Sequence, residues 1–328
     1  MSQAEDGRGK GTDARRSDVV IETRGLTRDF KDVHAVEGLD LTVRRAELFG
    51  LIGPDGAGKT TTLRLLAGLL TLTTGDATVA GHDLKQEPEA IKPHIGYMAQ
   101  RFSLYAELSV MENLRFFAEL YDVRADVREA RTERLLDFAG LTPFKSRRAE
   151  HLSGGMKKKL ALACTLIHEP PILLLDEPTT GVDPVSRREF WDILTELYTG
   201  GTTVVVTTPY MDEADRCSRV GLMYQGRLIR CDTPDAIRAE LGRDLIELQA
   251  EDWQAAQAVA GDLPGVSDVM TYGESLHLLV DAAEKRLPQI KARLEEEGIP
   301  YRSLRSTRPR MEEAFISLVR DREQEKVR

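Results

Sequence analysis

The sequence predicts an α/β fold with an inserted helical unit, followed by a small α+β domain of ferredoxin-like type. Three observations predict it. Residues 53–60 have the pattern G-x-x-x-x-G-K-T, between an apolar run and a helical pattern of leucines. The apolar run at 172–175 is typical of a strand buried on both faces of a parallel sheet. From residue 244 onward, strand and helix patterns follow in the order βαββαβ, with one helix added at the end.

The composition limits the number of domains, the class of protein and the kinds of partner. The chain has 328 residues, 41% of them apolar, which suffices for a large core and favours two domains. The formal net charge of −9 argues against a general nucleic-acid-binding surface, so no nucleic acid is expected as a partner. The apolar runs fall far short of the roughly 18 residues of a membrane span, and no signal-peptide core is evident, which favours a cytoplasmic protein. The three cysteines lie in no C-x-x-C spacing and indicate neither disulfides nor zinc.

The N-terminal segment 1–17 is poor in apolar side chains, and we expect it to form a disordered tail. The first domain is then expected at 18–240, beginning with strands near 19–21 and 36–43. Phe30 lies between these two strands. Taken alone it favours a place in the core, although an aromatic ahead of a phosphate loop can also stack on a base.

The segment 53–60 has the residues that a polyphosphate site needs. Gly53 and Gly58 let the backbone curl so that successive N–H groups point into one concavity, and the following helix adds the positive end of its dipole. Lys59 is long enough to reach the β- and γ-phosphates, and the Thr60 hydroxyl is placed to ligate Mg²⁺. The alternative is an ordinary glycine-rich turn, which the complete motif disfavours.

A helical subdomain is expected after this loop. Short strand patterns at 77–79 and 95–98 give way to a helical periodicity over 109–140, which predicts an insertion at about 101–168. The serine and two glycines at 153–155 start a further helix and form a second anion-binding nest. Without context, a capped helix with a flexible entry is the favoured interpretation of these residues.

Asp176 and Glu177 end the apolar strand at 172–175. Because ligands bind at the carboxyl ends of strands in α/β sheets, both carboxylates are expected to face the phosphate loop. Asp176 is suited to hold Mg²⁺, directly or through water, and Glu177 is suited to polarise an attacking water as a general base. Two acidic residues at a strand end are often only helix caps, but the phosphate loop favours the catalytic interpretation.

The ordered set of motifs resembles that of the ATP-binding subunits of ATP-binding cassette (ABC) transporters, over roughly residues 19–235. The motifs occur in the family order: the phosphate loop at 53–60, Gln100, LSGGM at 152–156, Glu177 after the buried strand, and GVDP at 181–184. The resemblance implies an ABC-type P-loop ATPase domain that uses ATP and Mg²⁺.

The resemblance also assigns roles to single residues. It makes Phe30 the aromatic that stacks on adenine, which reverses the interpretation from the residue alone. It makes Gln100 a Mg²⁺ ligand that also relays to a membrane partner. Gln100 and Glu177 together are the residues that the resemblance implies to be catalytic. The residues implied to contact ATP are Phe30, Gly53, Pro54, Asp55, Gly56, Ala57, Gly58, Lys59, Thr60, Thr61 and Asp176. Those implied to hold Mg²⁺ are Thr60, Gln100 and Asp176.

The same resemblance implies partners. In this family the LSGGM segment of one cassette closes over the phosphates bound by another, so Ser153, Gly154, Gly155 and Asp183 are expected to act across a dimer. The second cassette is either another copy of this chain or a different one, in a homodimer or a heterodimer. A separate transmembrane permease subunit is also implied, with this protein peripheral on the inner face of the cell membrane.

Three positions depart from the common family pattern. Asp55 replaces an asparagine in the phosphate loop and adds a negative charge there. Met156 replaces a glutamine, which we expect to be mild. Pro209 stands where the family has a switch histidine that contacts the γ-phosphate, and a proline side chain can neither donate a hydrogen bond nor titrate. Turnover is therefore expected to be slow, unless Thr208 or Tyr210 supplies the contact or the proline serves to stiffen the loop.

A linker near 241–243 is expected to lead into an accessory domain at 241–328, whose ending resembles the domain found behind cassettes of the ABC-2 export branch, which includes drug-resistance exporters. Regulation or dimer support is the expected role, with a packing appendage as the alternative. The predicted elements are strands at 245–249, 266–270, 275–280 and 300–305, and helices at 252–260, 283–297 and 311–320.

The leading hypothesis is an ATPase subunit that powers an exporter through ATP-driven dimer closure. One rival is a soluble ABC ATPase acting on DNA or the ribosome, but such relatives carry coiled-coil insertions or two cassettes, and this sequence has neither long heptads nor a second phosphate loop. The other rival is a regulatory switch that binds ATP with slow or no hydrolysis, which Pro209 motivates.

Overall fold

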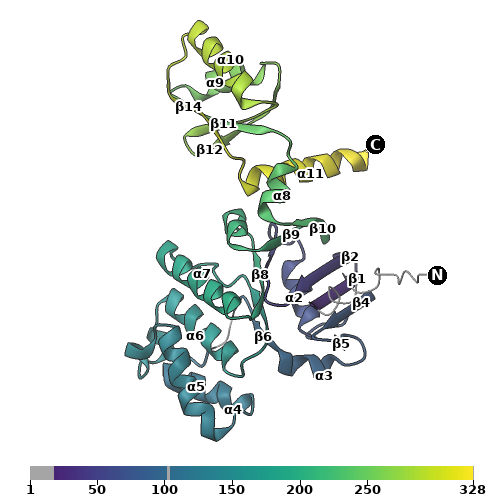
Figure 1. The fold of residues 1–328 in the computed structure, drawn as a ribbon, viewed down its shortest axis with the longest axis vertical. Coiled ribbons are helices and arrows are strands. Elements are labelled where there is room, and N and C mark those ends of the chain that lie inside the picture. Colours follow the sequence, from purple (N-terminus) through teal and green to yellow (C-terminus); the bar gives the residue numbers. More distant parts are fainter. Residues whose placement is uncertain (1–17, 102–103, 328) are drawn as a thin grey trace, which may run out of the picture. The chain divides into compact units, whose positions relative to one another are not determined.

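A computed structural model describes residues 18–101 and 104–327 (Figure 1). The tail expected at 1–17 lies outside the described residues. The chain forms two compact units that divide between Thr233 and Pro234. The short helix α8 (Pro234–Ala239), which the sequence analysis assigns to the first domain, belongs to the second unit because it packs against the C-terminal helix α11 (Met311–Val327). Among the described residues, every helix is too short or too polar to span a bilayer.

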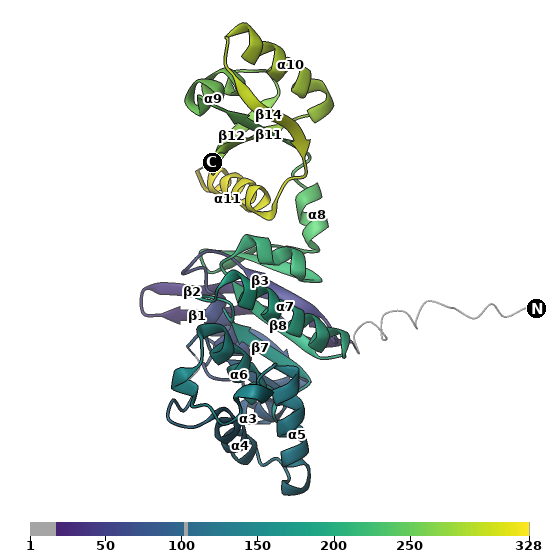
Figure 2. The same ribbon diagram turned by 90° about the vertical axis from the view of Figure 1, so that its left-hand side faces the viewer.

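The first unit is built on a six-stranded sheet in the order β10-β9-β3-β8-β7-β6, of which Figure 2 labels β3, β8 and β7. Every neighbouring pair is parallel except the terminal hairpin of β9 and β10. The apolar run at 172–175, predicted as a buried strand, is buried along its whole length in β7, and so are β3 and β8. The strands are β3 (Leu48–Ile52), β6 (Ile95–Met98), β7 (Ile172–Asp176), β8 (Thr203–Thr208), β9 (Arg219–Tyr224) and β10 (Arg227–Asp232).

A second, antiparallel sheet with the order β2-β1-β4-β5 packs on the same core through the helix α2 (Lys59–Leu66). Its strands are β1 (Val19–Phe30), β2 (Val33–Arg44), β4 (Thr74–Val79) and β5 (His82–Asp83). The first two are longer than predicted. Register shifts between them interrupt the alternation of apolar and polar residues, so the sequence pattern shows only part of each strand.

The predicted helical insertion contains α4, α5 and α6, which pack on one another (Figure 1). The helical pattern over 109–140 is split by Asp122, whose backbone has a left-handed φ of 52°. Ser109 and Glu112 form a reciprocal capping box at the start of α4. The helices of the unit are α3 (Pro88–Ile91), α4 (Val110–Leu120), α5 (Ala125–Phe138), α6 (Gly154–Leu166) and α7 (Pro184–Thr199), with short 3₁₀ turns at Lys92–His94, Thr142–Phe144, Ala149–His151 and Met211–Arg216 (η4).

The second unit has the predicted ferredoxin-like arrangement, an antiparallel sheet in the order β12-β13-β11-β14. Helices α9 and α10 cover one face, where they share an apolar core with the sheet. On the other face, Glu313 of α11 accepts a hydrogen bond from His277 at 2.7 Å. The elements are β11 (Asp244–Ala250), α9 (Trp253–Gly261), β12 (Val266–Tyr272), β13 (Ser275–Val280), α10 (Ala283–Glu296) and β14 (Tyr301–Thr307).

Candidate functional site

The loop between β3 and α2 has the tight geometry that its glycines predict. Gly56 and Gly58 have left-handed φ values of 78° and 100°. A Cβ added at Gly53 would lie 2.2 Å from the carbonyl oxygen of Met223, and one at Gly58 would lie 2.4 Å from that of Ala35. Glycine is therefore required at both positions by close backbone contacts. Asp55 is exposed at the tip of the loop.

Lys59 is almost fully buried under this loop. Its ammonium donates hydrogen bonds to the carbonyl oxygens of Gly53 at 2.7 Å and Pro54 at 3.0 Å. It also lies 3.3 Å from Oε1 of Glu177. The sequence analysis predicts that the phosphate loop and Glu177 face each other, and this ion pair brings them together.

Asp176, the last residue of β7, lies beside Thr60. The hydroxyls of Thr60 and Thr207 both donate to Oδ1 of Asp176 at 2.9 Å. The other oxygen, Oδ2, is buried and has no hydrogen-bond partner among the described residues. A buried carboxylate oxygen without a partner is costly, and a divalent cation or its bound water would satisfy it. The residues present therefore fit Mg²⁺, with Thr60 and Asp176 as its ligands.

Glu177 follows β7 directly and is held from several sides. Its backbone N–H donates to the Thr207 hydroxyl at 2.9 Å, and its Oε2 accepts from the Gln100 side chain at 2.8 Å. Its φ is +46°, a left-handed value that costs free energy for a residue other than glycine. The surrounding contacts maintain this strained backbone, which aims the carboxylate at the Lys59 ammonium.

Gln100, which follows β6, is fixed through both its side chain and its backbone. Lys158, in the first part of α6, donates to the Gln100 carbonyl at 2.9 Å. Burial lowers the pKa of Lys158. The sequence analysis missed this contact, because three successive lysines at 157–159 give no signal as to which of them turns inward.

Phe30 is the last residue of β1 and is 40% exposed, so the interpretation of Phe30 as a core residue is wrong. The Arg28 guanidinium carbon lies 4.5 Å from the ring centroid. Arg28 is itself tied to the Thr71 carbonyl by a hydrogen bond of 2.7 Å. The ring is thus supported by a fixed cation and still has accessible surface.

The residues predicted to act across a dimer have local structural roles in this chain. Ser153 caps α6 by accepting from the Met156 N–H at 3.3 Å. Asp183 caps α7 by accepting from the N–H groups of Val185 and Ser186, and the Ser186 hydrogen bond holds the pKa of Asp183 below its ordinary value. A Cβ on Gly155 would lie 2.4 Å from the Ser186 hydroxyl oxygen, so glycine lets α6 and α7 approach closely.

Pro209 directly follows β8. The carbonyl of the preceding Thr208 accepts a hydrogen bond from the Gly53 N–H at 3.3 Å. The residue before Pro209 is therefore bonded to the phosphate loop. The Thr208 hydroxyl accepts from the Tyr210 N–H at 3.1 Å, and the Arg187 guanidinium carbon lies 4.5 Å from the Tyr210 ring centroid. The segment is therefore well fixed, although Pro209 itself supplies no donor.

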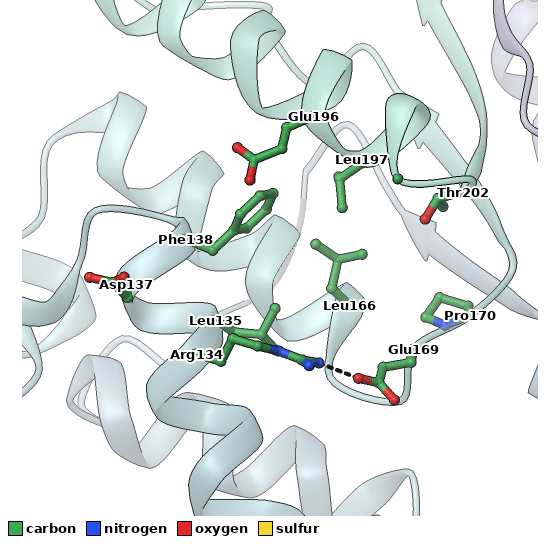
Figure 3. A pocket seen from close by; sticks show the side chains of 11 residues that line it. Arg134, Leu135, Asp137, Phe138, Leu166, Glu169, Pro170, Glu196, Leu197 and Thr202 are labelled. Carbon is green, nitrogen blue, oxygen red and sulfur yellow. Dashed lines mark hydrogen bonds and ion pairs between the residues drawn. The ribbon is translucent and has the colours of Figure 1, made fainter.

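A pocket of about 650 Å³ lies apart from these residues (Figure 3). It is lined by α5, α7 and the segments that precede β7 and β8, which places it toward the amino ends of those strands. Arg134 and Glu169 form an ion pair at its edge. The phosphate loop, Gln100, Glu177 and Pro209 follow the carboxyl ends of β3, β6, β7 and β8, so this part of the candidate site is at the opposite edge of the sheet.

Known proteins share the part of the chain that contains these residues. The family model described as "ABC transporter" matches residues 36–180. The probable multidrug ABC transporter ATP-binding protein YbhF of Escherichia coli is 47% identical over 227 residues, which are 69% of this chain and 39% of YbhF. This chain thus matches less than half of the length of that relative.

Other relatives match over nearly their full length. The daunorubicin resistance ATP-binding protein DrrA3 of Streptomyces coeruleorubidus is 37% identical over 308 residues, which are 93% of this chain and 97% of DrrA3. Among solved structures, the dimeric ATP-binding cassette MJ0796 bound to ADP and Pi has a TM-score of 0.60 at 26% identity, over 65% of this chain and 98% of that one.

Proposed function

Because this chain belongs to the ATP-binding proteins of the ABC transporter family, we propose that it binds and hydrolyses ATP to power an exporter whose membrane path is formed by a separate polypeptide. The observation that carries this proposal is the meeting of Lys59, Asp176 and Glu177 at one edge of the parallel sheet. A buried cation, a carboxylate with one oxygen unbonded among the described residues and a second carboxylate beside the cation are groups that phosphoryl transfer to water can use.

Each group has a role in this proposal. Lys59 exchanges its contacts with loop carbonyls for contacts with the β- and γ-phosphates. Thr60 and Asp176 hold Mg²⁺, with Gln100 as a further ligand, and the ion neutralises charge on the phosphates when bound. Glu177 accepts a proton from the attacking water. The hydrogen bond from Gln100 and the ion pair with Lys59 orient the Glu177 carboxylate for that step.

The remaining nucleotide contacts come from the phosphate loop and from Phe30. The N–H groups of residues 53–61 surround the phosphates, and the exposed ring of Phe30 stacks on adenine. We propose that another cassette covers the side of the phosphates that faces away from this loop.

That partner presents Ser153, Gly154, Gly155 and Asp183. The exposed serine and the amino end of the 13-residue helix α6 offer a hydroxyl and a helix dipole to the γ-phosphate. The dimeric cassette MJ0796 is similar to this chain and supports a two-chain arrangement. Both a homodimer and a pair with a different cassette agree with these contacts.

A membrane permease completes the assembly and places this protein on the inner face of the cell membrane. The names of relatives such as DrrA3, a resistance protein, favour export as the direction of transport. Position 209 favours a second candidate, a regulatory switch with little turnover, because a proline cannot supply the donor that the family's histidine gives.

Steady-state ATP hydrolysis by the purified protein, alone and with its membrane partner in detergent, separates the two. The powered exporter requires hydrolysis that the partner stimulates. The variant Glu177→Gln keeps the shape of the side chain but cannot accept the proton, so it should bind ATP, stop turning over and accumulate as a dimer on size-exclusion chromatography with Mg²⁺. A variant that stays monomeric at high protein concentration would count against the two-chain site.

A further inference from the structure

A buried carboxylate outside the ATP contacts connects three segments of the site. Glu213 lies in η4, four residues after Pro209, and is 2% exposed. Its Oε1 atom alone accepts three hydrogen bonds, from the Thr179 hydroxyl at 2.8 Å, from Nε of Arg187 at 2.6 Å and from the indole N–H of Trp191 at 2.9 Å. Three donors on one oxygen leave the side chain little freedom.

The charge of the buried Glu213 carboxylate is paired with that of Arg187. Arg187 forms an ion pair with Glu213 and a second, more exposed one with Asp212 at 2.8 Å. A buried carboxylate is retained only when its charge is paired and hydrogen-bonded, and Arg187 and the two neutral donors meet that need. Oε2 of Glu213 has no partner within the part of the chain that the structure describes. The hydrogen bonds that hold the Glu213 carboxylate are therefore all made to Oε1.

The hydrogen bonds of Glu213 connect the turn after β7, the segment after Pro209 and α7. Thr179 is two residues after Glu177, in the turn that follows β7. The Glu213 N–H donates to the carbonyl of Tyr210 at 3.3 Å, which fixes the segment after Pro209. Arg187 and Trp191 belong to α7, the helix that Asp183 caps.

We propose that Glu213 is a positioning residue for ATP hydrolysis, which holds the Glu177 turn through Thr179 and the 209–210 segment through its own backbone. This inference rests on the proposed function, because it concerns the same hydrolysis. The hydrogen bond between Thr179 and Glu213 links η4 to the turn after β7, and this turn orients the Glu177 carboxylate. Pro209 replaces the family's histidine and has no side-chain donor. The contacts of Glu213 hold the 209–210 segment in place without one.

The sharpest test removes one hydroxyl. Thr179→Val deletes the donor to Glu213 and keeps the shape of the side chain. A misplacement of about 1 Å at a catalytic group can cost on the order of 100-fold in rate, so we expect kcat to fall by roughly 10- to 100-fold. The hydrogen bonds of Thr179 within the described residues go to Glu213 and Val182, neither of which is a proposed ATP contact, so the KM for ATP should stay within about twofold of the wild-type value.

Two further variants separate positioning from simple stability. Thr132→Val is the matched control, since Thr132 of α5 is fully buried and its hydroxyl donates to the Arg128 carbonyl at 2.8 Å. It should lower the melting temperature by an amount comparable with Thr179→Val and leave kcat unchanged. Thr179→Ser restores a hydroxyl at the same place and should recover most of the lost kcat.

The outcomes distinguish this inference from the function on which it rests. Equal kcat values for wild type, Thr179→Val and Thr132→Val would overturn the positioning role while leaving the ATPase intact. A fall in kcat that Thr179→Ser fails to recover would also overturn it, since the hydroxyl would not be the cause. A wild-type protein that binds ATP but does not hydrolyse it, with or without its membrane partner, would overturn the proposed function and the inference with it.

Discussion

Replacing Phe30 with alanine tests whether its exposed ring stacks on adenine. The structure separates the two possible roles of this residue by its environment. A phenylalanine in a packed core typically costs about 3–5 kcal/mol of stability when truncated to alanine. Phe30 is 40% exposed at the end of β1, so we expect Phe30→Ala to reduce the free energy of unfolding by clearly less than that range.

The expected effect is on affinity. Stacking of a base on an aromatic side chain is worth about 1–3 kcal/mol, which corresponds to a Kd for ATP that is about 5- to 150-fold weaker. The Arg28 guanidinium lies 4.5 Å from the ring centroid and holds one side of the ring in place. Because a ring that is already held loses little conformational entropy when ATP binds, the loss of affinity should fall in the upper part of that range. Turnover at saturating ATP should be unchanged, since stacking stabilises the ground state and the transition state alike.

Calorimetric titration with ATP and a thermal melt on the same samples measure both quantities. Val33→Ala is the matched control, because Val33 pairs with Phe30 in the β1–β2 register and is 62% exposed. It should leave the Kd for ATP unchanged. An unaltered Kd for Phe30→Ala, accompanied by a large loss of thermal stability, would refute the stacking role.

Three further outcomes follow from the site. Lys59→Ala should abolish measurable ATP binding, since it removes the cation aimed at the phosphates, and retained binding in a titration would contradict that role. Pro209→His should raise kcat by up to about 100-fold, because one preorganised donor is worth on the order of 3 kcal/mol; equal, brisk hydrolysis in both proteins would mean that this chain needs no histidine. Gly155→Ala should lower the melting temperature, because its Cβ would lie 2.4 Å from the Ser186 hydroxyl oxygen, and Ser186→Gly should restore it; a Gly155→Ala protein as stable as the wild type would show that α6 and α7 can move apart at little cost.

The sequence was sufficient for the features that depend on short, contiguous segments. The glycines at 53 and 58, the strand before the phosphate loop, the buried strand at 172–175 and the ferredoxin-like order after 244 are all predicted, because loop geometry, strand burial and element order are encoded in local spacing. The lengths of β1 and β2 were underestimated because register shifts break the alternation on which the prediction depends.

The sequence by itself determined which residue types are present at the site, and the tertiary structure decided which of them meet. Thr60 and Asp176 are 116 positions apart, and only the parallel order of β3, β8 and β7 places their oxygens 2.9 Å from each other. The exposure of Phe30, the left-handed backbone of Glu177 and the three donors on Glu213 likewise had no local signal. Distances between remote segments are set by how the sheet and its helices pack, and no short stretch of sequence contains that information.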